Sequence, residues 1–575
     1  MSKSRKTIEQ IHALLREFGV KNIVFGAGGR HLPLIHSIEQ DEFFTTYRMV
    51  DERSAAFFAL GIIQQTGEPA AVCCTSGTAC INLASAVVEA YYQHLPLLVI
   101  SGDRMREYLN QNEDQLYDQI ESFKGFIKYA VQLPRIDSDT DLWFTNRVIN
   151  EALIELTHRG CGPVHIDFPI ENPFADVFEL ESMPEARKIS LVTAECRKAE
   201  WDEIVEMLQG KKVAVVWGQS VPYSDSLAKS VEHIGKVLNA VVLTDYMSNC
   251  RIPSVITNAP RLLHTIFSSK EREDLLPDIV ITVGGNTIFN SEMKAFVNNA
   301  NIEHWHVSPE GSIRDEYKRQ TMLFDMSEEF FFSHIIAHAK VVSHNTYLET
   351  WQSLEMDVPI PHSDNFDELH VIESLVNHLP DNSNLQVGNS WSVRMSQLFK
   401  IPNSCGVFCN RGVNGIDGSM STAVGFAASG RSLTFLVIGD LSFFYDMNAL
   451  WSQHLSSNMR ILLINNQGGS MLYKPFMREL MEKCPMANLG LGKQITAEGW
   501  CKTVGMNYHS ACSNDELEKE ICWLTQDKHD KPAILEVFTD FFNDANSYFQ
   551  NCSYDRRNVA GKIKSKAANV LKKLV

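Results

Sequence analysis

Hydrophobic runs and amphipathic segments alternate along this chain, which is the pattern of a doubly wound α/β protein. Residues 6–18 carry apolar side chains at helical spacing, and the apolar run 22–25 predicts a buried strand that ends at a glycine-rich turn. Further strands are predicted at Thr45–Met49, Ala70–Cys74, Leu97–Ser101 and Gly162–Pro169, with helices after Glu52 and after Ser76. A first α/β block therefore closes near Pro169.

The same alternation returns twice after polar connectors. Apolar runs at 212–218, 240–245 and 278–284 predict a middle block, whose loop 283–286 lacks a complete dinucleotide fingerprint, so we expect no cofactor of its own there. A connector at about 340–368 leads to a third block, 369–545. Because 575 residues exceed what one core can organise, we expect three doubly wound α/β domains, at residues 1–180, 195–345 and 365–555.

Two buried-strand patterns of the third block end in polar residues. The run 433–438 leads into Gly439-Asp440, and the run 461–464 leads into Asn465-Asn466 and a Gln-Gly-Gly turn. Segment 441–460 fits one crossover helix, which would bring both polar clusters to the same edge of a parallel sheet. Either half alone is a common turn sequence. Together, a carboxylate, an amide oxygen and a free carbonyl suit an octahedral Mg²⁺ that also binds phosphate.

This pair of motifs resembles the metal motif of the thiamine-diphosphate (ThDP) enzymes, which have Gly-Asp followed, after a spacer of this size, by Asn-Asn. The resemblance implies that Asp440, Asn466 and the carbonyl of Gly468 hold Mg²⁺, with Mn²⁺ as an alternative. It also implies the fold of ThDP-dependent decarboxylases and carboligases. In that fold, residues 1–180 form a pyrimidine-binding domain, 195–345 a central domain and 365–555 a diphosphate-binding domain.

A narrower resemblance covers nearly the whole chain and is dense in both outer blocks. The segments that carry it are 387–394, 410–418 and 439–446 in the third block, and 51–53, 75–79, 103–104 and 115–119 in the first. They resemble the MenD family, which makes 2-succinyl-5-enolpyruvyl-6-hydroxy-3-cyclohexene-1-carboxylate from 2-oxoglutarate and isochorismate in menaquinone biosynthesis. The resemblance implies a transferase that decarboxylates 2-oxoglutarate and passes the succinyl-semialdehyde unit to isochorismate.

The resemblance also assigns roles to individual residues. Glu52 matches the acid that hydrogen-bonds the pyrimidine ring and so produces the reactive imino tautomer; by itself, Glu52 would be an ordinary first-turn helix acid. Ile416 matches the bulky residue that keeps ThDP bent, which makes the proton transfer intramolecular. The implied cofactor contacts are Thr75, Ser76, Gly77, Asn389, Ser390, Gly415, Ile416, Gly439, Ser442 and Met471, and the implied substrate contacts are Arg30, Arg104, Gln115, Ser390, Arg394 and Arg411.

The residues expected to bind the donor substrate match the family better than those expected to bind the acceptor substrate. A guanidinium fork such as that of Arg394 suits the distal carboxylate of 2-oxoglutarate, although this arginine also fits a structural helix salt bridge. On the acceptor side, Gly29 stands where the family has a serine, and Asn290-Ser291 stands where it has basic residues. Two alternatives therefore stay open: a ThDP carboligase with a different acceptor, and a non-catalytic ThDP-binding protein. The second would be expected to lose the activating acid or a metal ligand, and this chain keeps both.

Composition excludes several other classes. Lys and Arg number 52 against 70 Asp and Glu, and the net charge of −18 argues against nucleic-acid or anionic-membrane binding as the main task. No signal core and no run of about 20 apolar residues occurs, so we expect a cytoplasmic protein with small-molecule substrates.

The 13 cysteines form no Cys-x-x-Cys pair and are therefore expected to be reduced thiols. The tail 562–575 could form an amphipathic helix or stay solvated. The family resemblance implies a homodimer or homotetramer whose site is completed across a two-fold interface.

Overall fold

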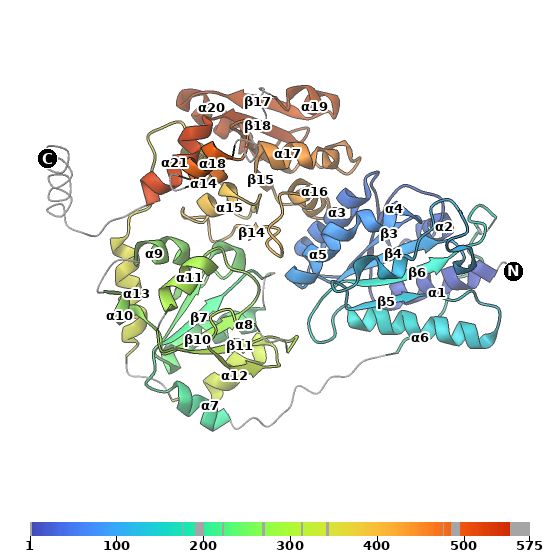
Figure 1. Ribbon diagram of the computed structural model, residues 1–575, viewed down its shortest axis with the longest axis horizontal. Coiled ribbons are helices and arrows are strands. Elements are labelled where there is room, and N and C mark those ends of the chain that lie inside the picture. The colour runs from blue at the N-terminus through green and yellow to red at the C-terminus, as the bar shows by residue number, and fades with distance from the viewer. Residues whose placement is uncertain are drawn as a thin grey trace.

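Three α/β units, each built on a six-stranded parallel sheet, make up the protein (Figure 1). The structure is a computed structural model that describes residues 3–175, 177–189, 201–220, 224–266, 271–298, 300–311, 314–340, 344–474, 477–484 and 495–552. The first unit is blue to cyan, the middle unit green to yellow and the third orange to red. The predicted fold class is confirmed.

The first sheet has the strand order β2-β1-β3-β4-β6-β5. Its strands are β1 (Asn22–Phe25), β2 (Thr45–Arg48), β3 (Ala70–Cys74), β4 (Leu97–Asp103), β5 (Tyr129–Gln132) and β6 (Val164–Pro169). Its helices are α1 (Lys3–Glu17), α2 (Leu32–Glu39), α3 (Glu52–Thr66), α4 (Thr78–Asn82), α5 (Ala84–Gln93), η1 (Arg106–Tyr108), η2 (Gln119–Phe123) and α6 (Asp139–Glu155). Every residue of β3 and β4 is buried, as expected for strands of a parallel sheet covered by helices on both faces.

The middle sheet has the order β12-β11-β10-β7-β8-β9. Its strands are β7 (Val213–Trp217), β8 (Ala240–Thr244), β9 (Val255–Ile256), β10 (Ile279–Val283), β11 (Glu303–Val307) and β12 (Gln320–Phe324). The helices are α7 (Trp201–Leu208), α8 (Asp225–Val237), η3 (Tyr246–Ser248), α9 (Ala259–Ile266), α10 (Glu271–Leu275), α11 (Asn290–Val297), α12 (Glu328–His338) and α13 (Thr346–Asp357). Helix α13 lies in the segment predicted as a connector, and its Tyr347 hydroxyl donates to the Leu275 carbonyl, so this helix packs on the middle unit.

The third sheet has the order β14-β13-β15-β16-β18-β17. Its strands are β13 (Asn384–Val387), β14 (Gly406–Phe408), β15 (Thr434–Gly439), β16 (Met459–Asn465), β17 (Asn507–Ala511) and β18 (Ala533–Phe538). The helices are α14 (Glu368–His378), α15 (Trp391–Ser396), α16 (Ser419–Ser429), α17 (Asp440–Tyr445), η4 (Met447–Trp451), η5 (Ser470–Tyr473), α18 (Arg478–Lys483), α19 (Glu498–Thr503), α20 (Asn514–Leu524) and α21 (Phe541–Cys552).

The strand orders locate a crevice in each sheet. Counted from the first strand of each sheet, both outer sheets have the order 2-1-3-4-6-5, whereas the middle sheet has the order 3-2-1-4-5-6. All strands are parallel, but the order in which the chain adds strands to the sheet changes from one side to the other at one point in each sheet. These points lie between β1 and β3, between β13 and β15, and between β7 and β10. In open parallel sheets, ligands bind outside the carboxyl ends of the strands at such a point. The turns that follow these six strands are therefore the first places to look for a site.

Helices α3 and α16, from the first and third units, cross with their backbones nearly in contact. A Cβ atom added to Gly61 would lie 2.0 Å from the Thr422 carbonyl oxygen, and one added to Gly425 would lie 2.2 Å from the Phe58 carbonyl oxygen. Such distances are far shorter than any van der Waals contact, so only glycine fits at either position. This crossing fixes how closely the two outer units approach each other.

The structure contradicts one prediction of detail, the crossover helix, and leaves another, the tail helix, untested. The prediction of one crossover helix over 441–460 is wrong, because α17 ends at Tyr445 and a separate 3₁₀ turn, η4, follows. The reason is Asp446, whose buried carboxylate accepts hydrogen bonds from the backbone N–H and the hydroxyl of Ser421 and so turns the chain toward α16. The predicted tail helix, 562–575, lies outside the described residues. Among the helices that are described, none is both long and apolar enough to cross a membrane.

Candidate functional site

The carboxyl edge of the third sheet brings the predicted metal ligands together. Strand β15 pairs in parallel with β16, with Gly439 opposite Ile464, so Asp440 lies beside the Asn-Asn pair. Asp440 is 1% exposed, and burial raises the pKa of its carboxyl to about 6. The Leu441 N–H donates to Oδ1 at 2.7 Å, whereas Oδ2 is buried with no hydrogen-bond partner in the described part of the chain. A buried carboxylate oxygen of this kind is costly unless a cation binds it, which fits a metal ligand.

The two adjacent asparagines have different partners. The side-chain amide of Asn465 donates to the Ile495 carbonyl and to Glu536, both at 2.7 Å, which fixes the end of β16. Asn466 donates to Asp544 Oδ2 at 2.8 Å and to the Ser470 hydroxyl at 3.3 Å. Both amide hydrogens of Asn466 are thus bound by protein. Its Oδ1 therefore turns toward the 467–469 turn, where the Gly468 N–H donates to it at 3.2 Å. This orientation presents an oxygen, as a hard metal requires.

Asp544 is a residue of this site that sequence reasoning missed. It lies in α21, far downstream of the motif, and is buried. Besides Asn466, it accepts hydrogen bonds from the Thr539 hydroxyl at 2.6 Å and from the Glu368 N–H at 2.7 Å. Burial raises the pKa of Asp544 to about 7. Nothing in its local sequence signals this role, because the contact depends on where α21 packs.

Side-chain amides shape the loop that connects β14 to α16, residues 409–418, here called the motif loop. Asn389 Nδ2 donates to the Asn410 and Gly415 carbonyls at 2.7 Å each, and Arg411 donates to Asn389 Oδ1 at 3.0 Å. The Ser442 hydroxyl donates to the Ile416 carbonyl. The side chain of Ile416 is nevertheless 41% exposed, so a large apolar group is presented at the edge where the cofactor contacts were expected.

Three cations gather beside these residues. Burial lowers the pKa of both Arg411 and Lys474, and the positive charge of Arg394 lowers each of them further. No carboxylate of the described chain lies within ion-pair distance of Arg394, Arg411 or Lys474. Ser390 donates to the Met471 sulfur at 3.1 Å at the same edge. A group of cations without acidic partners is suited to an anionic ligand. Lys474 was not predicted, because a lone lysine after a turn carries no sequence signal.

A second cluster occupies the carboxyl edge of the first sheet. The Arg30 N–H donates to the Thr75 hydroxyl at 3.1 Å, and a Cβ on Gly77, whose φ is +83°, would lie 2.9 Å from the Gln115 Cβ. The turns after β1 and β3 and the loop of Gln115 are thus packed against each other. Burial lowers the pKa of Arg30, and the neighbouring charge of Arg104 lowers it further. Two predicted substrate contacts therefore lie close together.

Buried side chains support this edge from below. Asp167 accepts hydrogen bonds from Ser101 at 2.6 Å and from Gln119 and Gln132 at 2.8 Å each. Gln119 in turn accepts from the Gly77 N–H at 2.7 Å, which anchors the turn that contains Ser76. The hydroxyl of Ser76 is itself buried without a partner in the described chain. Burial, together with the charge of Asp167, raises the pKa of Asp103 to about 8.

Glu52 begins α3 where the first and third units meet. Its carboxylate accepts from Asn82 at 3.4 Å, so it faces the edge of the first sheet. On either side of it, Asp51 accepts from Asn448 at 2.9 Å, and Arg53 donates to the Tyr445 carbonyl at 3.0 Å. Tyr445 is the last residue of α17, the helix that Asp440 begins, and Asn448 lies in η4 just after it.

The predicted residues thus form two groups, one at each outer sheet. Within one chain, no hydrogen bond or ion pair of the described residues joins Glu52, Arg30 or Gln115 directly to the metal-edge group. In the middle unit, Asn290-Ser291 begins α11. The nearby Lys294 faces Glu316: burial raises the pKa of Glu316, and the charge of Lys294 partly opposes that rise.

Comparisons with known proteins agree with this geometry. Residues 5–122 match the family model described as thiamine pyrophosphate enzyme, N-terminal TPP binding domain. A 2-succinyl-5-enolpyruvyl-6-hydroxy-3-cyclohexene-1-carboxylate synthase of Phocaeicola vulgatus is 38% identical over 94% of this chain and 96% of its own. Proteins of the same name from Bacteroides fragilis and Bacteroides thetaiotaomicron are 37% and 36% identical, over 95% of this chain and 98% of theirs. Among solved structures, benzoylformate decarboxylase from Polynucleobacter necessarius shares the fold, with a TM-score of 0.70 and 16% identity over 93% of this chain and 98% of that one.

Proposed function

Because the chain belongs to the family of 2-succinyl-5-enolpyruvyl-6-hydroxy-3-cyclohexene-1-carboxylate synthases, we propose that it decarboxylates 2-oxoglutarate and adds the succinyl-semialdehyde unit to isochorismate. The chain is a ThDP-dependent enzyme of menaquinone biosynthesis by this membership. Two observations in the described part of the chain carry the proposed chemistry: a buried Asp440 oxygen has no hydrogen-bond partner, and Arg394, Arg411 and Lys474 at the same edge form no ion pair. The expected cytoplasmic location stays a prediction.

In this proposal, Asp440, Asn466 and the Gly468 carbonyl hold Mg²⁺, with Mn²⁺ as the alternative, and the metal binds the diphosphate. The amide orientation of Asn466 and the unsatisfied Oδ2 of Asp440 support the assignment. ThDP, when bound, supplies the carbon that accepts the electrons released by decarboxylation. Thr75, Ser76, Gly77, Asn389, Ser390, Gly415, Ile416, Gly439, Ser442 and Met471 are the proposed cofactor contacts.

Glu52 is the proposed catalytic acid. A protonated carboxyl at this position would donate a hydrogen bond to the pyrimidine ring nitrogen, which favours the tautomer that removes the reactive proton. Its place at the start of α3, where the first unit meets the third, supports the role. The exposed apolar side chain of Ile416 would support the bent cofactor from the other side.

Donor selection would rest on Arg394 and Arg411, with Ser390 beside them and Lys474 as an additional cation. 2-Oxoglutarate carries a distal carboxylate that pyruvate lacks, and pyruvate would leave buried cations unpaired. We therefore expect Arg394→Ala to reduce the preference for 2-oxoglutarate over pyruvate, measured as the ratio of the two kcat/KM values. An unchanged ratio would remove Arg394 from donor recognition.

Arg30, Arg104 and Gln115 are the proposed acceptor contacts, and they lie at the edge of the first sheet. Because no hydrogen bond or ion pair of the described residues joins them to the metal edge of the same chain, we propose a homodimer or homotetramer. In it, the first unit of one subunit would complete the site on the third unit of another. Sedimentation of the active enzyme tests this: a strictly monomeric active species would contradict it.

A second candidate is a ThDP carboligase with the same donor and a different acceptor. Lys294, the cation nearest in sequence to Asn290-Ser291, faces Glu316, which favours this candidate. One experiment separates the two. Purified protein with ThDP and Mg²⁺ receives 2-oxoglutarate with and without isochorismate, and products are identified by mass spectrometry. The synthase product confirms the first candidate, decarboxylation without that product favours the second, and no turnover of 2-oxoglutarate contradicts both.

A further inference from the structure

The backbone of the motif loop is held by side chains from all three units. Asn389 and Ser442 of the third unit bind its two ends, as described above. The first half, from Cys409 to Val413, is also bound by Glu89 of the first unit and by Gln219 and Asn286 of the middle unit. A loop whose peptide groups are bonded to three separate bodies has little freedom to move on its own.

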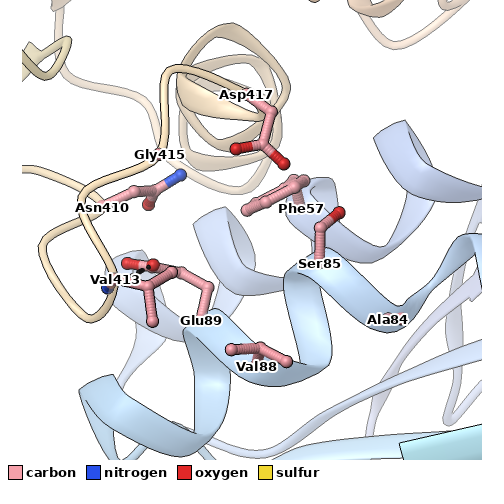
Figure 2. Close-up of a pocket in the computed structure, with 9 residues that line it drawn as sticks. All are labelled: Phe57, Ala84, Ser85, Val88, Glu89, Asn410, Val413, Gly415 and Asp417. Carbon is pink, nitrogen blue, oxygen red and sulfur yellow. Dashed lines mark hydrogen bonds between the residues drawn. The ribbon is translucent and has the colours of Figure 1, made fainter.

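Glu89 binds two successive peptide N–H groups. Its Oε1 accepts from the Gly412 N–H at 2.8 Å and its Oε2 accepts from the Val413 N–H at 3.0 Å. Figure 2 shows this carboxylate on α5, pointing up at the motif loop from below, beside a cavity of about 300 Å³. Glu89 is 2% exposed, and burying a carboxylate is costly unless donors surround it. Only a carboxylate can accept at both of its oxygens, so the residue type fits this task.

The middle unit holds the opposite side of the same peptides. Asn286 Nδ2 donates to the Arg411 carbonyl at 2.7 Å and to the Gly412 carbonyl at 3.3 Å, and Gln219 donates to the Cys409 carbonyl at 2.6 Å. Gln219 and Asn286 follow β7 and β10, the two strands between which the strand order of the middle sheet changes side. The Gln219 N–H donates to the Asn286 carbonyl at 3.0 Å, so these two turns are also bonded to each other.

The three units are closely packed where they meet. The cavity lined by Gln93, Gln219, Asn286 and Arg411 has a volume of only about 30 Å³. A Cβ atom on Gly412 would lie 2.8 Å from the Glu89 carbonyl oxygen, so α5 touches the loop at its backbone. In the described chain, only Glu89 is bonded to the Gly412 N–H and only Asn286 to the Arg411 carbonyl. Removing either side chain therefore leaves the loop room to shift.

We propose that Glu89 and Asn286 are positioning residues: from two other units, they fix the motif loop so that Arg411 and Ile416 stay where substrate and cofactor would contact them. This inference rests on the proposed function, because it assigns the loop its ligands. It gives the middle unit a task at the site between the outer units. The edge of its sheet where a doubly wound fold would bind a ligand supplies amide groups to the neighbouring loop.

Asn286→Ala is the main test, and Asn345→Ala is its matched control. Asn345 is an asparagine of the same unit whose amide also donates to two carbonyls, those of Gly235 and Ala240, but both lie within that unit. We expect Asn286→Ala to weaken ThDP binding in the presence of Mg²⁺ on the order of tenfold by calorimetry, and to raise the KM for 2-oxoglutarate. Asn345→Ala should change either value by no more than about twofold, even where its melting temperature falls equally.

Glu89→Gln provides a readout that needs no ligand. Glutamine keeps one acceptor oxygen and turns an N–H₂ group toward the other peptide N–H, so one of the two bonds is lost. We expect faster amide hydrogen exchange in the peptide that covers 409–418 in the cofactor-free protein, together with weaker ThDP binding. Unchanged exchange in Glu89→Gln would overturn the part assigned to Glu89.

The outcomes separate this inference from the proposed function. Equal ThDP affinity in Asn286→Ala and Asn345→Ala would overturn the inference while the wild-type enzyme remains active. A wild-type chain that binds ThDP but does not turn over 2-oxoglutarate would overturn the proposed donor, and the ThDP affinities would still decide the inference. A wild-type chain that binds no ThDP would overturn both.

Discussion

The two outer sheets share one strand order, yet their carboxyl edges are built in different ways. The first edge is supported by its own hydrogen bonds: Asp167, Gln119 and Ser101 form a buried network beneath the turns, and close contacts fill the space between them, although the Ser76 hydroxyl has no partner in the described chain. Among the described residues, the third edge leaves the Asp440 Oδ2 without a hydrogen bond and leaves Arg394, Arg411 and Lys474 without an ion pair. One scaffold thus provides a preformed surface in one place and, in the function proposed above, a surface completed by its ligands in the other. Changes at the first edge should therefore alter chemistry or protein stability, whereas changes at the third should alter ligand binding.

The largest effect is expected from Glu52→Gln at the first edge. The amide cannot supply a carboxylic proton to the pyrimidine, so kcat should fall by roughly 100- to 10,000-fold. ThDP affinity should stay within a few-fold, because the proposed metal and diphosphate contacts lie on the other sheet. Steady-state kinetics and calorimetry measure the two quantities. The exposed acid of the same unit, Glu68, gives a control in Glu68→Gln, which should behave as wild type. Substantial residual turnover in Glu52→Gln would exclude Glu52 as the acid.

Asp440→Ala should produce the complementary result at the third edge. Loss of a metal ligand should weaken Mg²⁺-dependent ThDP binding by about 100-fold or more. The ligand-free protein should not be destabilised, because the substitution removes a buried carboxylate whose Oδ2 has no hydrogen bond. Calorimetry with and without a chelator gives the affinity, and thermal melts of the ligand-free protein give the stability. Unchanged affinity would show that the metal binds elsewhere.

Asp544→Asn should have a smaller effect in the same direction. Its amide could no longer fix which way the Asn466 side chain points, so the apparent Mg²⁺ affinity should fall by about 10- to 100-fold. Asp540→Asn is a suitable control, since Asp540 caps the start of the same helix without touching Asn466. A metal titration at fixed ThDP compares the two variants. Equal Mg²⁺ affinities would mean that Asp544 only supports the fold.

The smallest expected effect concerns stability at the first edge. The pKa of Asp103, raised to about 8 from its ordinary 3.8, means that the folded protein holds this proton more tightly than the unfolded chain does. Its stabilising effect is complete below about pH 4 and is lost as the pH rises through 8. Asp103→Asn mimics the protonated form, so its melting temperature relative to wild type should rise by a few degrees from pH 5 to pH 9. A constant difference across that range would show that Asp103 titrates normally in the fold.

The sequence predicted the strands better than the contacts between units. The bounds of β1 and β3 agree with their predicted ranges, because short apolar runs bounded by glycines are strong signals. The pairing of Asp440 with the Asn-Asn turn was also predictable, since parallel strands end at a common edge. Domain boundaries and the roles of the site residues stay predictions.

Other features could not be predicted from local patterns. Asp544, Lys474, Glu89 and Asn286 act through partners far away in the chain, and a single polar residue in a helix or turn has no periodicity that marks it. The break after α17 has the same origin. Asp446 ends that helix by bonding Ser421 of α16, a contact that exists only in the folded protein. Long-range polar contacts therefore limited the prediction more than secondary structure did.

The glycine crossing of α3 and α16 has a consequence for recombining this chain with its relatives. Gly61 and Gly425 belong to different units, and each would collide with backbone rather than with a movable side chain. A compensating substitution on the opposite helix cannot create the missing space, because a peptide carbonyl cannot be made smaller. Chimeras that exchange the first or third unit should assemble only when both donors carry glycine at their side of the crossing. These two positions are therefore a simple test of compatibility that can be applied to any pair of parents before a chimera is made.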